Sequence, residues 1–212
     1  MRNIRRTARH AGSHYQYGDL RNALIAAATG LAQEEGPDAV TLREVARRVD
    51  VSPAAVYRHF ASHDDLLGAV KQRALAAMAK VMKAELARTP AGNDRAQAAV
   101  DRLRALGGAY LTFAFSEPGL FRLIFGRRGH PVTGQPSPEP QDDPLTMLAA
   151  ALDELVAAGG LPANRRPHAE VAAWAAVHGL ATLCLDGPLA ATPPAGRQAL
   201  ADRTVDAILN GI

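Results

Sequence analysis

The chain has 212 residues, with 24 basic and 21 acidic side chains, and a single cysteine, Cys184. A chain of this length can bury a core without disulfide bonds or structural zinc, and one thiol can form neither. A lone cysteine is also typical of a reducing compartment. No signal peptide is visible, and no segment reaches the roughly 18 uncharged apolar residues that a membrane helix needs. We therefore expect a cytoplasmic protein of one or two domains with no membrane partner.

Charge is distributed unevenly along the chain. Residues 1–18 carry a net charge of +4 and residues 71–130 a net charge of +7, whereas residues 19–70 carry −3 and residues 131–212 carry −5. Such asymmetry suits an N-terminal half that meets a polyanion, although solvated helix faces and a solvated tail explain it as well. We expect residues 1–18 to form a flexible basic arm, which either reaches the DNA backbone or minor groove or remains a solvated tail.

Apolar residues recur at intervals of three and four, which predicts an all-α fold. The first helix is expected at 19–35, capped by Asp19. A second, at 42–49, follows a sequence with the form of a capping box, in which the Thr41 hydroxyl and the Glu44 carboxylate each accept from a backbone amide. Ser52 and the proline after it start a short third helix. Ser62 caps a fourth helix that ends near residue 88.

The remainder of the chain predicts a second helical unit. Its helices are expected at about 93–116, 118–125, 145–158, 167–185 and 195–209. Residues 126–144 hold five prolines and three glycines, which predicts a mobile loop, either a tolerated insertion or a pocket lid. The expected domains are thus a DNA-binding unit at 19–68 and a sensing and dimerising unit at 69–212.

Two short capped helices joined by Val49-Asp50-Val51 have the outline of a helix-turn-helix. The stretch TLREVARRVDVSPAAVYRHFASHDDLL, residues 41–67, closely resembles the DNA-binding signature of TetR-family transcriptional regulators. The resemblance implies an N-terminal three-helix DNA-binding domain, a helical C-terminal ligand-binding and dimerisation domain, and a double-stranded DNA operator as partner.

The third helix should bury Val56 and Phe60 and direct its opposite face toward the major groove. Arg43 and Arg58 are the expected base readers because guanidinium groups can pair with base edges. Tyr57 and His59 resemble phosphate-contacting positions of the family. The candidate DNA-binding residues are Thr41, Arg43, Ser52, Pro53, Ala54, Ala55, Tyr57, Arg58, His59 and His63. Thr41 and Ser52 would attract phosphate at helix N-termini or serve as plain helix caps.

Two positions depart from the family pattern. Asp50 replaces the usual glycine of the turn, which costs conformational energy and adds a negative charge near DNA. His63 replaces a lysine that commonly opens the fourth helix, so a fixed charge becomes one that is mostly neutral at pH 7. His59 and His63 are four residues apart, but without a third ligand they predict no metal site.

The segments at 109–126 and 173–183 resemble the C-terminal domain of a TetR subgroup named for its Trp-His-Gly signature, here Trp174, His178 and Gly179. This resemblance implies a domain that senses a small molecule and dimerises. Small-molecule sites are mostly apolar with a few polar groups. The candidate pocket residues are Tyr110, Phe113, Phe121, Met147, Trp174 and His178, and residues of these types are more often ordinary core residues than ligand contacts.

The helix at 167–185 is apolar on nearly all sides, so it must be covered on two faces. We expect it to form half of a four-helix dimer interface with Ala201, Val205 and Ile208 of the last helix, which would place Cys184 on the dimer face. A monomeric core is the alternative. The pair Gly107-Gly108 marks either a close backbone approach or a kink.

These patterns predict a homodimeric, sequence-specific transcriptional regulator. The family resemblance favours a repressor that an unidentified small-molecule effector releases from a palindromic operator, with no other cofactor. One alternative is a ligand-independent dimeric DNA-binding protein. A helical enzyme using Cys184 or His178 is the other, but the chain has no nucleophile elbow, phosphate-binding glycine loop or HExxH motif, so no catalytic residue is predicted.

Overall fold

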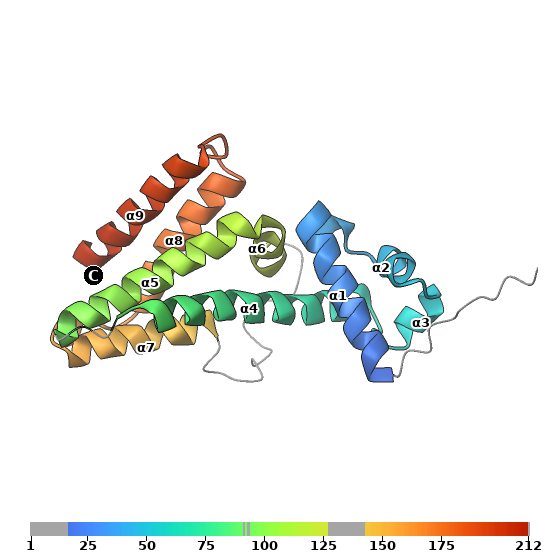
Figure 1. Cartoon of the computed structure of the whole chain (residues 1–212), viewed down its shortest axis with the longest axis horizontal. Helices are drawn as coiled ribbons and strands as arrows, with labels where there is room; N and C mark the ends of the chain where they lie inside the picture. The colour runs from blue at the N-terminus through green and yellow to red at the C-terminus, as the bar shows by residue number, and fades with distance from the viewer. Residues whose placement is uncertain (1–16, 91, 93, 127–142, 212) are drawn as a thin grey trace, which may run out of the picture.

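The computed structural model describes residues 17–90, 92, 94–126 and 143–211, and every regular element within them is a helix, as predicted (Figure 1). The α-helices are α1 (Tyr17–Glu35), α2 (Leu42–Val49), α3 (Pro53–Tyr57), α4 (His63–Arg88), α5 (Arg95–Ser116), α6 (Pro118–Phe125), α7 (Pro144–Ala157), α8 (Ala169–Leu185) and α9 (Pro194–Gly211). Most of the predicted basic arm and of the predicted loop at 126–144 lies outside the described residues.

The molecule is elongated, with α1–α3 at one end and α5 and α7–α9 at the other (Figure 1). We call α1–α3 the head. The long helix α4 starts in the head and runs beneath α6 to pack along α5, so it joins the two ends. No helix among the described residues is long and apolar enough to cross a membrane.

Side-chain caps determine where the short helices begin. The Thr41 hydroxyl accepts from the Glu44 amide at 3.1 Å, and the Ser52 hydroxyl accepts from the Ala55 amide at 3.2 Å. Ser62 and Asp65 form a reciprocal capping box at the start of α4. These three caps are confirmed, and each satisfies amides that a helix leaves without partners in its first turn.

Two predicted helix starts need correction. The box at Thr41 is only half formed, because the Glu44 carboxylate pairs with the Arg47 guanidinium at 2.9–3.0 Å instead of a backbone amide. The first helix begins at Tyr17, so Asp19 lies in its first turn and is not its N-cap. An acidic residue in that turn still interacts favourably with the helix dipole.

Asp50 ends α2 in the left-handed conformation, with φ 58° and ψ 48°. Its amide donates to the carbonyl groups of Ala46 and Arg47, which closes the last turn of the helix. The position therefore has the left-handed backbone geometry that favours glycine, as the comparison with the family pattern predicted.

The dimer-face assignment of three C-terminal residues is wrong. Cys184 is fully buried within the subunit, and Ala201 and Val205 are 3% and 5% exposed. Val205 faces α5, where a β-carbon on Gly107 would lie 3.0 Å from its side chain. Gly107 thus marks a close approach between α5 and α9. The large apolar side chains that α8 leaves exposed are those of Val171 and Leu183.

Candidate functional site

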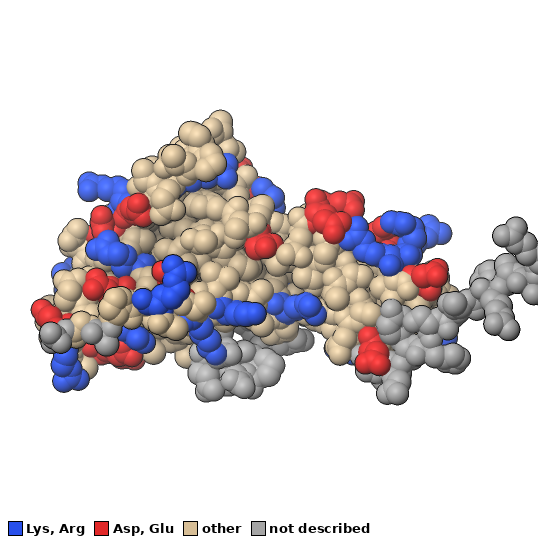
Figure 2. Space-filling view, viewed as in Figure 1, with Lys and Arg blue, Asp and Glu red and all other residues tan. Residues whose placement is uncertain are grey.

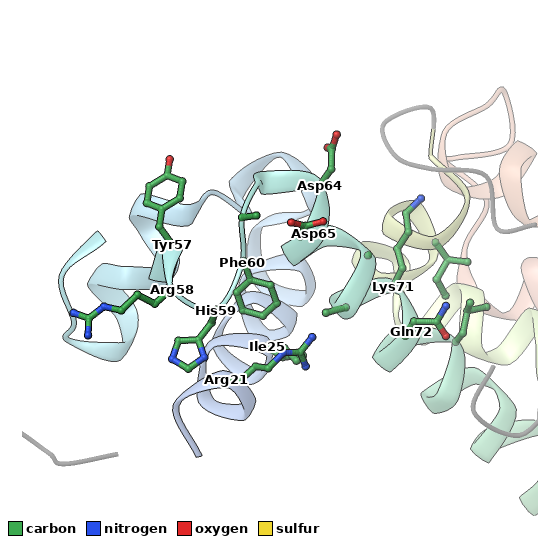
Figure 3. Close-up of a pocket in the computed structure, with 15 residues that line it drawn as sticks. Arg21, Ile25, Tyr57, Arg58, His59, Phe60, Asp64, Asp65, Lys71 and Gln72 are labelled. Carbon is green, nitrogen blue, oxygen red and sulfur yellow. The ribbon is translucent and has the colours of Figure 1, made fainter. Parts of the chain in front are cut away.

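The helix α3 presents one buried face and one exposed face. Val56 is fully buried, and Phe60, just beyond the helix, is 2% exposed. Pro53, Ala54, Tyr57 and Arg58 are exposed, and Ala55 is half-buried. Tyr57 is 57% exposed, more than any other large hydrophobic side chain in the described part of the chain. In Figure 3 the Tyr57 and Arg58 side chains point away from Phe60. A protruding α3 is what insertion into a DNA groove requires.

The N-termini of α2 and α3 lie next to this face. The Thr41 and Ser52 oxygens accept from amides of their own helices, and both residues are exposed, as is Arg43 on α2. A hydroxyl group that accepts an amide can still donate its hydrogen to a phosphate oxygen. The two residues therefore combine the capping role with a geometry that suits phosphate contact.

Two of the basic side chains of α2, Arg47 and Arg48, form ion pairs with acidic neighbours. Arg48 donates to Glu34 at 2.7 Å, which ties α2 to the end of α1, and Arg47 pairs with Glu44. Hydrogen bonding to these guanidinium groups lowers the pKa of both carboxyl groups. Figure 2 shows basic and acidic side chains gathered together over α1 and α2. The Arg48–Glu34 pair links α2 to α1, the Arg47–Glu44 pair lies within α2, and Arg43 takes part in neither.

The two histidines of the motif lie in different surroundings. The Nε2 atom of His63 is 2.6 Å from the Val40 carbonyl oxygen, so this ring nitrogen donates within the protein. His59 is half-buried in the turn that leads to α4. Among the described residues no group of three potential metal ligands occurs, at this histidine pair or elsewhere.

A cavity of about 670 Å³ lies behind α3, between α1, the α3–α4 turn, the first half of α4 and the end of α6 (Figure 3). We call it the head cavity. Tyr57 and Arg58 line it, together with Phe60 and Lys71. Its walls thus come from both the α3–α4 turn and the helix α4, which leads into the rest of the chain.

Four of the six predicted pocket residues come together in an aromatic cluster of Tyr110, Phe121, Phe125, Trp174 and His178. The Phe125 ring centroid lies 4.9 Å from that of His178 and 5.0 Å from that of Phe121. The indole of Trp174 donates to the Tyr110 hydroxyl oxygen at 3.2 Å, and that oxygen is 2.9 Å from Nδ1 of His178. The cluster joins α5, α6 and α8.

The donors and acceptors around the Tyr110 oxygen determine the tautomer of His178. Indole N–H can only donate, so it occupies one lone pair of the Tyr110 oxygen. The phenol hydrogen then has Nδ1 of His178 as its acceptor, which leaves the hydrogen of the neutral imidazole on Nε2. Burial lowers the pKa of His178 and raises that of the Tyr110 phenol, so both side chains are uncharged at neutral pH. His178 therefore has an N–H donor at Nε2, among the aromatic rings of the cluster.

The other two predicted pocket residues lie elsewhere in the core. Phe113 is 1% exposed and Met147 on α7 is buried, and neither shares a ring contact with the cluster in the described structure. The prediction missed Phe125, although its spacing of four from Phe121 places both on one face of α6.

The helix α6 also contacts the head. Gly119 packs directly on the backbone of Ala32 at the end of α1, and Gln33 donates to Glu117 at 2.9 Å. At its other end, Arg122 donates to Asp186 at the end of α8 at 2.8 Å. One short helix thus contacts the head, the aromatic cluster and α8.

The capped helices, left-handed turn and protruding α3 define a helix-turn-helix protein. Residues 24–70 match the family described as bacterial regulatory proteins, tetR family, and residues 103–208 match the family described as Tetracyclin repressor-like, C-terminal domain. The chain belongs to the TetR family.

Three similar proteins illustrate the relationship. The HTH-type transcriptional repressor Rv3405c of Mycobacterium tuberculosis is 42% identical over 52 residues, which cover 24% of this chain and only 28% of that protein. The uncharacterized HTH-type transcriptional regulator Rv0681 of the same species is 26% identical over 168 residues, 79% of this chain and 71% of that one. A solved structure of unknown function from Rhodococcus sp. RHA1 is 25% identical and superposes with a TM-score of 0.75, covering 96% of this chain and 99% of that one. The first two carry the names of regulators and not of enzymes.

Proposed function

We propose that the protein is a sequence-specific DNA-binding transcriptional regulator that acts as a homodimer on a near-palindromic operator. The exposed face of α3, with Tyr57 outermost above a buried Val56, is the observation that carries this proposal. We assign DNA binding to residues 19–68 and sensing and dimerisation to residues 69–212. We propose no catalytic site and no enzymatic activity.

The exposed residues divide into base readers and phosphate contacts. Arg43 and Arg58 carry guanidinium groups that can donate twice to guanine, and Ala54 can contact a thymine methyl group. Tyr57 donates a phenol hydrogen to phosphate. His63 contributes less than the lysine it replaces, because its Nε2 atom already donates to the Val40 carbonyl oxygen.

Dimerisation through α8 and α9 would bring two heads to one operator. Val171 and Leu183 of α8 remain exposed in the single subunit. A second copy of the chain packed on this face would bury both side chains, which supports α8 as part of the dimer interface. The recognition helices must then lie roughly 34–36 Å apart to enter successive major grooves.

Trp174, His178 and Gly179 support placing the chain in the Trp-His-Gly subgroup.

A small-molecule effector would bind at the aromatic cluster and release the repressor from DNA. The Nε2–H group of His178 can donate to an acceptor oxygen of the effector. An uncharged oxygen suits it best, because an anionic one would favour the protonated imidazole. In that form Nδ1 carries a hydrogen and can no longer accept from the Tyr110 hydroxyl group. A flat apolar body would pack on the half-buried rings of Trp174 and Phe125. The contacts of α6 with α1 supply a physical route from that site to the head, and the effector shifts the equilibrium only if it prefers one head position.

DNA binding is tested by selecting duplexes from a random library and mapping bound sites in the genome. We expect a palindromic site, with the logarithm of its affinity falling linearly with the logarithm of salt concentration. The Arg58→Ala variant should bind the selected duplex more weakly and relax its preference at one base position. Equal affinity for selected and unrelated duplexes at physiological salt would contradict the proposal.

Effector binding is tested with Trp174, the single tryptophan, whose fluorescence reports on the cluster. A panel of uncharged aromatic ketones should change its emission and weaken binding to the selected duplex in parallel. A panel that leaves both signals unchanged, while DNA binding remains specific, would favour the ligand-independent regulator instead.

A further inference from the structure

Arg47 lies on an exposed flank of α2, one helical turn after Arg43. Residues four apart project from the same face of a helix, so both side chains face solvent together. Arg48, the next residue along, projects about 100° further around the helix. It pairs with Glu34 at the end of α1, and its side chain is 29% exposed, whereas the Arg47 side chain is 71% exposed. Arg47 is thus the more open of the two ion-paired arginines of α2.

The guanidinium group of Arg47 lies close to the start of α2. Side chains in a helix lean toward its N-terminus, and Arg47 reaches back to Glu44 in the first turn. That turn begins at the cap residue Thr41. In a helix-turn-helix the second helix enters the major groove and the first crosses the DNA backbone. Figure 1 shows α2 beside α3 in the head, and the two helices are in contact. A cation at the exposed start of α2 is therefore placed to meet a backbone phosphate.

The contact with Glu44 occupies one edge of the guanidinium group. Nε of Arg47 donates to the two Glu44 carboxylate oxygens at 2.9 and 3.0 Å, and Nη2 donates to one of them at 2.5 Å. A guanidinium group carries five N–H bonds in one plane. Glu44 accepts from the Nε hydrogen and from one hydrogen of Nη2. The outer edge, formed by Nη1 and the second hydrogen of Nη2, has the fork geometry that holds a phosphate group bidentately.

We propose that the outer edge of Arg47 contacts a phosphate group of the operator backbone, and that Glu44 is a positioning residue that orients this edge. Carboxylate and phosphate contact different edges of the guanidinium group, so the ion pair persists when DNA binds. A long side chain loses rotamer freedom on binding, and the ion pair removes part of that freedom beforehand. The inference rests on the DNA-binding function and adds a contact that carries no sequence information itself.

The opposite role for Glu44 is competition with phosphate for Arg47. A carboxylate that only competes weakens DNA binding, so its removal should strengthen binding. A carboxylate that orients the arginine strengthens DNA binding, so its removal should weaken it, even though a negative charge near DNA is lost. The sign of the change in affinity therefore separates the two roles.

A second ion pair of the same kind provides a matched control. Glu85 and Arg88 on α4 also lie three residues apart, and their side chains are 39% and 77% exposed, against 31% and 71% for Glu44 and Arg47. Arg88 is the last residue of α4, which starts in the head at His63. At a rise of about 1.5 Å per residue, Arg88 lies roughly 35 Å from that start. Arg88→Gln therefore makes the same change in charge at a comparable exposure, far from α2.

The phosphate contact is tested by measuring the affinity of the full chain for the selected duplex by fluorescence anisotropy over a range of salt concentrations. Arg47→Gln should weaken binding about tenfold. The slope of log affinity against log salt should become shallower by about 0.9 for each subunit bound, with the base preference unchanged. Arg88→Gln should change neither the affinity nor the slope. An unchanged slope in Arg47→Gln, or an equal effect of Arg88→Gln, would overturn the contact.

The positioning role is tested in the same assay. Glu44→Ala should weaken binding about threefold, as expected when one long side chain is ordered only on binding. Glu44→Gln, which keeps an acceptor oxygen for the guanidinium group, should bind more tightly than Glu44→Ala. In the Arg47→Gln background, Glu44→Ala should cause no further weakening. Tighter binding by Glu44→Ala, or a loss that persists in that background, would overturn the positioning role.

Circular dichroism and thermal melting verify that each variant folds, and Glu85→Ala is the control for Glu44→Ala. A chain that binds selected and unrelated duplexes equally would contradict the DNA-binding function itself. A chain that binds the selected duplex specifically, and binds it as tightly with Arg47→Gln, would contradict only the role of Arg47.

Discussion

Gly119 of α6 lies against the peptide carbonyl group of Ala32 of α1, so that the two helices meet backbone to backbone. A β-carbon at residue 119 would overlap the Ala32 carbonyl oxygen and lie 2.9 Å from its carbonyl carbon. Phe121 follows two residues later and belongs to the aromatic cluster. A displacement of the cluster that moves α6 must therefore move the end of α1 or separate the two helices.

Replacing Gly119 with alanine should force this contact apart. Because the obstructing atoms are backbone, no side chain can rotate away, and we expect the free energy of unfolding to fall by about 1–3 kcal/mol. Urea denaturation measures the change. Gly108→Ala is the control, since a β-carbon there meets no atom within 4 Å; it should raise stability by up to about 1 kcal/mol through helix propensity. Equal effects of the two substitutions would contradict the close approach as the cause.

Local chemistry made much of the fold predictable. A hydroxyl residue before an apolar run identifies a helix start whatever surrounds it, so Thr41, Ser52 and Ser62 were sufficient to locate three helices. The left-handed turn at Asp50 was predictable from the family resemblance, because a glycine is usual at that position of the turn. The exposed face of α3 was equally readable, because Val56 and Phe60 leave only one side for solvent.

Tertiary neighbours were not predictable in the same way. Cys184 and Val205 lie on apolar faces, and periodicity shows that such a face is covered without showing whether the same subunit or a second one covers it. Phe113 and Phe121 are both buried aromatic residues, yet only Phe121 joins the cluster, because the packing of α5 on α6 and α8 decides which rings meet. The head cavity depends on four segments and has no local signal.

Tyr57→Ala should weaken DNA binding without unfolding the head. The side chain is 57% exposed, so its removal costs little core packing. Loss of a hydrogen bond to a charged phosphate should reduce affinity by about 1.5–3 kcal/mol, roughly ten- to hundredfold. Fluorescence anisotropy with the selected duplex measures the affinity, and thermal melting should show an unchanged transition.

Phe60→Ala provides the contrasting variant three residues later. Phe60 is 2% exposed, and its truncation should cost about 3–5 kcal/mol of stability through the lost burial and the cavity left behind. A loss of stability at Tyr57 approaching that at Phe60 would place Tyr57 in the core and contradict its proposed role.

Tyr110→Phe should destabilise the aromatic cluster. The substitution leaves the Trp174 indole N–H and Nδ1 of His178 without the oxygen they share, and an unsatisfied buried polar group costs about 1–3 kcal/mol. Phe113→Leu is a control that removes an aromatic core side chain without touching this network.

Nitrogen NMR of the imidazole shows which ring nitrogen of His178 carries the hydrogen. In the unmodified chain His178 should be protonated at Nε2, and a predominant Nδ1–H form would contradict the hydrogen-bond assignment.

The same network predicts how stability depends on pH. Burial lowers the pKa of His178 below its ordinary 6.5, so below that pH the unfolded chain binds a proton that the folded chain excludes. Its contribution is present above pH 6.5 and is lost as the pH falls through the folded pKa. Burial raises the pKa of Tyr110 above 10.0, so stability also falls as the pH rises beyond that value. Denaturation across pH 4–11 should show a smaller acidic loss in His178→Gln and a smaller alkaline loss in Tyr110→Phe than in the unmodified chain. An unchanged profile in either variant would contradict the assignment.

Replacing Asp50 separates conformation from charge at the turn of the motif. Asp50→Gly relieves a left-handed φ of 58° and should raise the free energy of unfolding by about 1 kcal/mol. It also removes a negative charge beside α3, the helix proposed to enter the DNA groove, so DNA affinity should rise several-fold, and more at low salt. Asp50→Asn removes the same charge but keeps a side chain that tolerates this conformation, so it should match the glycine variant in DNA affinity with stability nearly unchanged. If the asparagine variant binds DNA no better than the unmodified chain, the charge of Asp50 does not limit DNA binding, and any gain in the glycine variant comes from the relaxed turn.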